Sequence, residues 1–549
     1  MLKIIPLGGL GEIGLNMMVI EYEDVIFIID AGLMFPEDYM LGVDIVIPAM
    51  DYLRENRNKI QAVVITHAHE DHIGALPYLL KEIRLPVYGT AFTLGIVRRK
   101  LMEFDLNKYI DLNLISPGET LSIDPFDIDF IRVSHSTVDG VGLAIQTPEG
   151  VIIHTGDFRI SPNADNLLNT DISSFARFGE AGVLALLSDS TNVEVKGYTL
   201  SEQEVARNLK NTINASKGRV IVALFASNVF RIQQVIDIAV SNNRKVIFHG
   251  RSMEQIIAVA TELGHIHYPA NTILDIKQIA KVNDNEVVII TTGSQGEPMS
   301  ALARMASGVH KHIKIKKGDS VILSSKHIPG NEKAIAGIIN KLYRRGADVI
   351  YSKIAQIHAS GHAHQEELKM MINLVKPRYF IPVHGEYRHL VVHARLAETL
   401  GIPRENVLVA ENGKVICFDQ DGGRIDGQVN TGRVLVDGKG IGDVGRSVLK
   451  ERRELSEGGL VVVTMIIDEE TGVVLYGPEL ISKGFVFDAA TGYLVDDAQC
   501  VILEIVEEID VNTKHRVEVL RKKIQRALKQ YFAFAINRNP LIVPVIIEV

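Results

Sequence analysis

The feature that most constrains this chain is the segment 66–72, which follows an apolar run at residues 62–65. Within the six residues 67–72 it places the imidazoles of His67, His69 and His72 and the carboxylate of Asp71. Neutral imidazole and ionised carboxylate are ligands that suit divalent zinc. Four such groups exceed what one ion needs if more ligands arrive from elsewhere in the chain. The segment therefore predicts a dinuclear metal site.

Three more candidate ligands follow segments that read as β-strands. His135 comes after an alternating run at residues 126–133, Asp157 after residues 151–156, and His384 after residues 379–383. Because strand tips gather at one edge in sheet-based α/β folds, groups far apart in sequence can converge on one pocket. Any one His or Asp at a strand end is equally well explained by solubility or capping. Seven together favour a common site.

At these residues the chain resembles the metallo-β-lactamase superfamily, whose H-x-H-x-D-H motif stands here as His67-x-His69-x-Asp71-His72. Within that superfamily the chain is similar to the ribonuclease J family, a nucleic-acid-processing branch with a β-CASP insertion. The closer resemblance rests on the segments 188–192, 225–228, 359–363 and 383–386, and it extends over essentially the whole chain. It implies an α/β fold: a metallo-β-lactamase αββα sandwich, an inserted parallel-sheet β-CASP domain and a small C-terminal α/β domain.

The resemblance also implies a set of metal ligands. His67, His69 and His135 would hold one metal, Asp71, His72 and His384 the other, and Asp157 would bridge the two. Two Zn²⁺ per chain are expected, with Mn²⁺ or Mg²⁺ as alternatives. Two such ions lower the pKa of a shared water and stabilise the charge that grows on phosphorus during in-line displacement.

Beside the metals, the resemblance implies a catalytic set of Asp71, His362 and Asp189. His362 would serve the leaving 3′-oxygen of a phosphodiester, and Asp189 would orient it or act as its acid/base partner. The alternative for Asp189 is an N-cap or turn, where Asp is common. With both metals already supplied, His358, His364 and Glu386 are expected to be structural.

Two segments are candidates for holding a phosphate. Ser360, Gly361 and His362 offer a hydroxyl, a backbone open to close approach and an imidazole, while Gly293 and Ser294 lie on a loop after a predicted strand. The alternative for the second segment is a tight turn. The resemblance places a 5′-monophosphate pocket at Ser360, with Ser227 and Asn228 of the inserted domain adjoining it.

The segment Gly9 to Gly14 fits the G-x-G-x-x-G pattern of dinucleotide sites, and Asp30 follows it. Such a site requires a helix after the glycines. Residues 16–23 and 24–29 instead read as a hairpin, which disfavours a dinucleotide cofactor. The resemblance implies that this segment is a structural turn and that Asp30 lies beside the metals.

The length of 549 residues suggests three to four domains. We expect a metallo-β-lactamase domain at 1–195 and 356–446, an inserted β-CASP domain at 196–355, a charged linker at 447–459 and a C-terminal domain at 460–549. The inserted domain is expected to alternate helices (202–216, 229–241) with strands (219–225, 245–250, 286–292, 320–324). The C-terminal domain is expected to hold strands at 460–467, 473–476, 480–487 and 541–548, with a helix at 512–532.

Composition limits the partners and the compartment. The net charge of −9 means that RNA affinity must come from local fields, and the basic clusters at 98–100, 311–317 and 514–529 read singly as solvated faces. Cys417 and Cys500 form no disulfide framework or thiolate zinc motif. Neither a signal peptide nor a membrane span is recognisable. We therefore expect a cytoplasmic protein.

The leading hypothesis is a metal-dependent ribonuclease, a 5′-to-3′ exonuclease preferring 5′-monophosphate ends with added endonuclease activity, in RNA decay and maturation. Its expected partners are RNA, a second copy in a homodimer or homotetramer, and RNA-decay proteins such as a helicase or a paralogous subunit. One alternative is a small-molecule metallohydrolase, which needs the first metal motif but no insertion of about 150 residues, a typical domain size. The other is a non-catalytic RNA-binding or scaffolding subunit, which a missing ligand would favour; none of the seven is missing.

Overall fold

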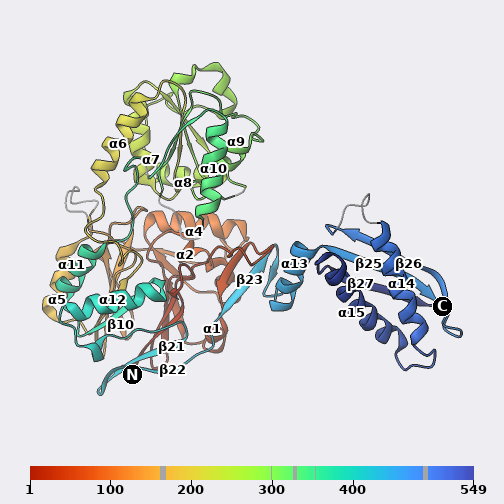
Figure 1. Cartoon of the computed structure of the whole chain (residues 1–549). Helices are drawn as coiled ribbons and strands as arrows, with labels where there is room; N and C mark the ends of the chain where they lie inside the picture. Colours follow the sequence, from red (N-terminus) through yellow and green to blue (C-terminus); the bar gives the residue numbers. More distant parts are fainter. Residues whose placement is uncertain (161–168, 298, 326–330, 353, 486–491) are drawn as a thin grey trace. The chain divides into compact units, whose positions relative to one another are not determined.

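The computed structural model describes residues 1–160, 169–297, 299–325, 331–352, 354–485 and 492–549. The chain forms two compact units (Figure 1), one of Met1–Met34 with Ile47–Arg433 and the other of Phe35–Val46 with Val434–Val549. Residues 434–446, which we expected in the metallo-β-lactamase domain, thus group with the second unit. The finer domain boundaries stay a prediction.

Two sheets form the centre of the first unit. Their strand orders are β22-β21-β1-β3-β4-β6-β7-β8 and β19-β13-β12-β11-β10-β9. The strands are β1 (Leu2–Gly8), β3 (Met17–Tyr22), β4 (Val25–Ile29), β6 (Ile60–Val64), β7 (Val87–Gly89), β8 (Leu112–Leu114), β9 (Thr120–Ile123), β10 (Phe126–Arg132), β11 (Val141–Thr147), β12 (Gly150–His154), β13 (Ala185–Asp189), β19 (Tyr379–Val383), β21 (Lys414–Asp419) and β22 (Gly422–Gln428). Their facing apolar side chains make one core, in which the rings of Phe27 and Phe126 lie 5.1 Å apart edge to face.

Helices cover the outer faces of this pair of sheets. The first part of the unit holds α1 (Asp51–Glu55), α2 (Glu70–Ile73), α3 (Leu76–Glu82) and α4 (Ala91–Glu103), of which α4 contacts β7 and β8. On the six-stranded sheet pack α5 (Ile172–Ala181), α11 (Gln365–Val375) and α12 (Tyr387–Thr399). The short strands β2 (Leu10–Gly11) and β20 (Gly385–Glu386) pair with each other. The predicted αββα sandwich is confirmed.

Two local features of this domain follow from its sequence. The expected hairpin after the glycines is confirmed, because β3 and β4 pair antiparallel and β3 directly follows the glycine-rich segment. Residues 70–82 form two helices, because α2 ends at Ile73 and α3 begins at Leu76. Pro77 explains the break, since proline cannot donate to Ile73 and its ring would clash with that carbonyl inside a helix.

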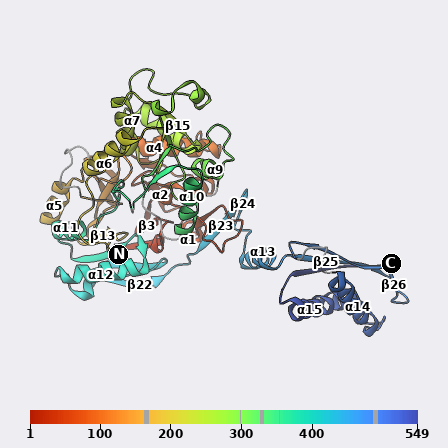
Figure 2. The same ribbon diagram turned by 45° about the horizontal axis from the view of Figure 1, so that its top comes forward.

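The inserted segment forms a five-stranded parallel sheet in the order β15-β16-β14-β17-β18, as predicted. Its strands are β14 (Val220–Ala223), β15 (Lys245–His249), β16 (Val287–Thr291), β17 (Ser320–Leu323) and β18 (Asp348–Ile350). One face packs against α6 (Glu202–Ala215), α7 (Val229–Ser241) and α8 (Arg251–Glu262), and the other against α9 (Ala301–Ser307) and α10 (Glu332–Arg344). All five helices are labelled in Figure 1, and Figure 2 gives a second view of α6, α7, α9 and α10. Apolar strands covered on both faces are typical of parallel sheets.

Buried charges link the inserted sheet domain to the two-sheet domain. Glu202, the first residue of α6, pairs with Arg159 at 2.9 Å and also with Arg231. Arg231 has no exposed side-chain surface and donates to the Ile357 carbonyl at 3.0 Å. Burial raises the pKa of Glu202, but the two guanidiniums outweigh burial and lower it. The carboxylate is therefore ionised between two cations from different parts of the chain.

The second unit contains β23 (Arg433–Asp437) and β24 (Gly440–Ile441), then α13 (Arg446–Gly458), and a sheet in the order β26-β25-β27. The sheet strands are β25 (Leu460–Ile467), β26 (Val474–Lys483) and β27 (Leu541–Glu548), and they pack against α14 (Gly492–Glu508) and α15 (Arg516–Ile536). The predicted strands at 460–467 and 541–548 are confirmed. Among the described residues no helix is both long and apolar enough to cross a membrane.

Three predictions for this unit differ from the structure. The charged segment 447–459, expected as a linker, is almost entirely the helix α13. The two strands expected at 473–476 and 480–487 are a single strand, β26, and residues 486–487 lie outside the described part. The helix α14 was not predicted. The helix expected at 512–532 exists but runs from Arg516 to Ile536, because His515 adopts a left-handed conformation before it.

Candidate metal centre

The seven candidate ligands meet at one edge of the two-sheet sandwich. Four follow β6, in the loop before α2 and in α2 itself, and the other three follow β10, β12 and β19. Their ligand atoms form two groups that could each hold a metal ion, and Asp157 belongs to both. The convergence predicted from the strand ends is therefore present in the structure.

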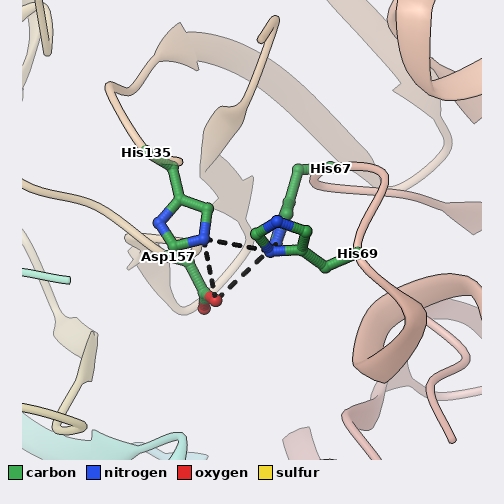
Figure 3. Close-up of side chains that lie close together, drawn as sticks. All are labelled: His67, His69, His135 and Asp157. Carbon is green, nitrogen blue, oxygen red and sulfur yellow. Dashed lines mark hydrogen bonds and ion pairs between the residues drawn. The ribbon is translucent and has the colours of Figure 1, made fainter. Parts of the chain in front are cut away.

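The first group contains His67, His69, His135 and Asp157 (Figure 3). The His69 Nδ1 atom lies 3.0 Å from His67 Nε2 and 3.1 Å from His135 Nε2. The Asp157 Oδ2 atom lies 3.6 Å from His67 Nε2 and 3.8 Å from His135 Nε2. Three ring nitrogens and one carboxylate oxygen thus face a common point, which is the ligand set of a tetrahedral divalent cation.

The second group contains Asp71, His72, Asp157 and His384. The Asp157 Oδ2 atom lies 3.3 Å from His72 Nε2 and 3.6 Å from His384 Nε2. The Asp71 Oδ2 atom lies 3.4 Å from His384 Nε2 and 3.7 Å from His72 Nε2. Two carboxylates and two imidazoles therefore surround the second point.

The outer nitrogens of three of these rings are held by other groups. His72 Nδ1 lies 2.7 Å from Asp30 Oδ2, and His135 Nδ1 donates to the Gly361 carbonyl at 2.8 Å. His384 Nδ1 lies 2.7 Å from Thr191 Oγ1. A proton on each Nδ1 leaves the Nε2 lone pair directed at the ligand group, which is the tautomer that a metal requires. Asp30 thus lies beside the centre, as expected.

The charges of the cluster also suit a cation. Burial lowers the pKa of His67 and His135 well below the usual value and that of His69 to about 4. Burial raises the pKa of Asp157, but the imidazoles of His384 and His72 outweigh burial and hold it well below its usual range. The three imidazoles of the first group are therefore neutral beside an ionised carboxylate, which are protonation states that bind metal. In the second group burial lowers the pKa of His72 and His384, but Asp157 and Asp71 outweigh burial and raise it, for His384 to about 9, so these two rings must lose a proton when metal binds.

Asp189 and His362 form a pair next to the second group. His362 Nδ1 lies 2.8 Å from Asp189 Oδ2 and 3.9 Å from Asp157 Oδ2. Asp189 is buried, and its other oxygen accepts from the Thr191 amide and hydroxyl. The carboxylate therefore contacts His362, as the resemblance implies, and also closes the turn at 189–191, which was the alternative for it; its acid/base role stays a prediction.

The candidate phosphate residues fall into two sets. Ser360, Gly361 and His362 lie next to the metal groups, and Ser227 Oγ lies 3.0 Å from His69 Nε2. Asn228 caps α7 instead, since its side chain accepts from the Arg231 amide. Among the described residues, Gly293 and Ser294 make no hydrogen bond or ion pair with the seven candidate metal ligands. Gly293 has a positive φ of 104°, as a tight turn requires, so that alternative is supported and their phosphate role stays a prediction.

Several residues beside the centre were not assigned from the sequence. Asn192 Nδ2 donates to Ser360 Oγ at 2.7 Å, and Arg159 donates to the Ser360 carbonyl at 3.2 Å. Arg159 lies two positions after Asp157, which is the one signal that could have indicated it. His364 and Glu386 stand at the N-caps of α11 and α12, in line with the structural role expected for them.

Comparison with known families matches four parts of the chain. Residues 10–190 match the metallo-beta-lactamase superfamily and residues 217–342 the ribonuclease J beta-CASP domain. Residues 347–409 match the RNA specificity domain of Zn-dependent metallo-hydrolases, and residues 447–549 the ribonuclease J C-terminal domain.

Relatives are similar over the full chain. Ribonuclease J 1 of Streptococcus pyogenes serotype M3 is 42% identical over 546 residues, which cover 99% of this chain and 97% of that protein. Ribonuclease J of Thermus thermophilus is 43% identical, with coverage of 100% and 95%. A crystal structure of a protein of unknown function from Enterococcus faecalis V583 is similar in fold alone, with a TM-score of 0.53, 15% identity and coverage of 76% and 99%.

We predict that Gly361→Ala weakens metal binding. A Cβ at position 361 would lie 2.7 Å from Cε1 and 2.8 Å from Nδ1 of His135, so that ring must move from its place in the first group. Loss of an outer partner of a ligand weakens metal affinity by about 10- to 100-fold. Metal content after dialysis against graded chelator measures the change. The matched control is Gly337→Ala, where a Cβ meets nothing within 4 Å; equal retention in both variants would contradict the prediction.

Proposed function

The chain belongs to the ribonuclease J family, and from this premise we propose that it is a metal-dependent ribonuclease that hydrolyses phosphodiester bonds of RNA. The observation that carries the proposal is the pair of ligand groups around Asp157, closed on one side by Ser227 of the inserted domain. A small-molecule hydrolase needs the ligand groups but has no use for that domain. A non-catalytic scaffold has no use for seven intact ligands.

The proposed metal content is two Zn²⁺ per chain, with Mn²⁺ or Mg²⁺ as alternatives. His67, His69 and His135 would hold one ion, Asp71, His72 and His384 the other, and Asp157 both. When bound, two such ions supply a nucleophile at neutral pH and neutralise charge on the phosphate oxygens. The oriented Nε2 atoms and the ionised Asp157 support this assignment.

The protein's own groups would position the substrate and move a proton. Asp189 holds a proton on His362 Nδ1 through the 2.8 Å contact, which fixes the ring orientation. The ring is partly exposed, with 22% of the His362 side chain accessible. From there His362 would donate to the leaving 3′-oxygen. Its role is one of general acid catalysis, which contributes about 10²- to 10⁴-fold.

We also propose that the enzyme acts as a 5′-to-3′ exonuclease on 5′-monophosphate ends and cuts internally, in RNA decay and maturation in the cytoplasm. Ser360 Oγ accepts from Asn192 and from the His362 amide, so its own proton is left to donate to a terminal phosphate oxygen. Gly361 beside it leaves room for close approach. The pocket around Ser360 would have too little room for a triphosphate. RNA-decay proteins such as a helicase or a paralogous subunit are the partners that the family suggests.

A homodimer, alone or within a homotetramer, is proposed from the second unit. The face of its sheet away from α14 and α15 carries an apolar set that is exposed in the single chain: Ile481 at 46%, Val543 at 38%, Val545 at 39% and Ile547 at 52%. Exposed apolar patches of this kind mark protein interfaces. The occupant we propose is the same face of a second copy.

Asp157→Asn should abolish RNA cleavage, by more than about 100-fold, because it removes the charge from the one ligand shared by both groups. Metal content should fall with it while the circular dichroism spectrum is retained. The matched control is Asp127→Asn, because Asp127 is exposed and only accepts hydrogen bonds such as that from Ser122, away from the ligand groups. Near-normal turnover by a variant shown to have lost its metal would overturn the hydrolytic mechanism.

Ser360→Ala should slow exonuclease action on 5′-monophosphate RNA by roughly 10- to 150-fold, since one hydrogen bond to a charged group contributes about 1.5 to 3 kcal/mol. Cleavage of an RNA with a blocked 5′ end should be spared. The measurement compares 5′-monophosphate, 5′-triphosphate, 5′-hydroxyl and blocked RNAs under one metal and salt condition, and the same panel separates the nuclease from the non-enzyme alternatives. Equal loss on all substrates would place Ser360 in the catalytic centre and remove the separate end pocket.

Val545→Lys should dissociate the dimer, raising its dissociation constant by at least about 10-fold, because a lysine ammonium would be buried without a partner in the interface. Sedimentation velocity over a concentration series measures it. Val473→Lys, at a valine that is 58% exposed before β26, is the control and should leave the assembly unchanged. A Val545→Lys protein that sediments like the parent chain would contradict this interface.

A further inference from the structure

One stretch of the inserted domain has a charge opposite to that of the whole chain. Residues 301–350 contain ten Lys or Arg and three Asp or Glu, in a protein whose net charge is −9. Part of this excess of positive charge lies in the basic segment 311–317, which from the sequence alone is interpreted as a solvated face. The structure adds cations from a second element to it.

The added cations come from the last turn of α10 and its C-cap. Arg345 Nε donates to the Ala306 carbonyl at the end of α9 at 2.7 Å, and Lys341 Nζ donates to Ser307 Oγ at 3.3 Å. A Cβ on Gly346 would lie 3.2 Å from Lys317, so the turn before β17 adjoins this end of α10. Lys341, Arg344 and Arg345 line an open hollow of about 440 Å³ with Ala306 and Ser307. We call Lys317, Lys341, Arg344 and Arg345 the distal basic cluster.

Within the described residues, the cations of the distal basic cluster have no acidic partners. Two nearby acids are engaged elsewhere, Asp284 with Lys316 at 2.6 Å and Asp319 with Arg219 at 2.6 Å. In the described ranges no carboxylate is paired with any of the four cations of the cluster. Two of them, Arg345 and Lys341, serve the C-terminus of α9, where cations are favourable. Helix capping leaves Lys317 and Arg344 unexplained.

The cluster lies at the end of the inserted sheet that is remote from the metal centre. Ser227, which contacts His69, follows the carboxyl end of β14, whereas Lys317 precedes the amino end of the parallel neighbour β17. The 13 residues of α10 span the distance between the two ends, about 20 Å at 1.5 Å per residue. At the 3.4 Å rise of a stacked strand, this distance corresponds to roughly six nucleotides past the catalytic region.

We propose that the distal basic cluster is an RNA-binding exosite that holds the phosphate backbone of a substrate beyond the catalytic site. The proposal rests on the proposed function for the identity of the polymer. An RNA backbone carries one negative charge per nucleotide, and a cluster of four cations offers several phosphates a favourable field. The exosite contributes affinity that depends on RNA length and on salt, and it makes no demand on base sequence.

The test reverses the two cations that helix capping leaves unexplained, in the double variant Lys317→Glu and Arg344→Glu. Arg345 is left in place because it caps α9. The control is Arg207→Glu and Lys210→Glu, two exposed cations on α6, which covers the opposite face of the same sheet, and neither is ion-paired within the described residues. Both variants change the net charge of the full-length protein equally.

Binding is measured by fluorescence anisotropy with single-stranded RNAs of 40 and 5 nucleotides, at several salt concentrations. The cluster variant should bind the 40-mer about 10-fold more weakly at low salt, with a salt slope smaller by about 1.4, the value for two lost single-strand contacts. The 5-mer, which cannot span the distance, should bind within twofold of the parent affinity. The control variant should match the parent protein on both RNAs.

Three outcomes would overturn the exosite. The first is an unchanged affinity of the cluster variant for the 40-mer, which would leave an acidic protein as the occupant. The second is an equal loss of affinity for both RNAs. The third is an equal loss of affinity in the control variant, which would show that the effect comes from net charge alone. Anisotropy requires no turnover, so a chain without nuclease activity could still show the exosite. Cleavage of the 5-mer, measured in parallel, tests the proposed function separately.

Discussion

The site depends on one buried carboxylate. Asp157 Oδ2 lies within 3.3 to 3.9 Å of nitrogens from five imidazoles, those of His67, His72, His135, His362 and His384. These rings come from three separate strand ends and one loop, so the oxygen fixes where each of them must arrive. A carboxylate with almost no exposed surface is costly unless cations or hydrogen bonds compensate it. The imidazoles supply part of that compensation, which is why they hold its pKa low.

The sequence predicted that the candidate ligands converge, because their positions follow from local patterns. Each lies just past an apolar run, and strand ends share one edge whatever the sheet order. The contacts that orient the ligands could not be predicted in this way. Thr191 reaches His384 only because β13 and β19 pair in parallel with Asp189 opposite Val383. Such a register is a property of the assembled sheet and leaves no periodic trace in the sequence.

The errors have physical causes of the same kind. The cap formed by Asn228 was not identified, because a residue in a strand-to-helix turn can serve either the helix or a ligand; its place beside a phosphate pocket stays a prediction. The helix α14 was not predicted, although Ala498, Ile502 and Ile505 share one buried helical face. Its β-branched residues Val501 and Ile502 are also common in strands, which weakens the helical signal. In α13, where every position is at least partly accessible, the charges that suggested a linker lie along a solvated helix.

The loop before α11 shows how the inserted domain and the metal centre are coupled. Its Ile357 carbonyl accepts from Arg231, its Ser360 carbonyl from Arg159, and its Gly361 carbonyl from His135. Glu202 pairs with both arginines, so one ion network holds two points of a loop whose next residue orients a candidate ligand. A buried network of this kind contributes little net stability after desolvation. Its consequence is geometric, because the inserted domain cannot shift against the sandwich without moving the carbonyl that sets the His135 tautomer.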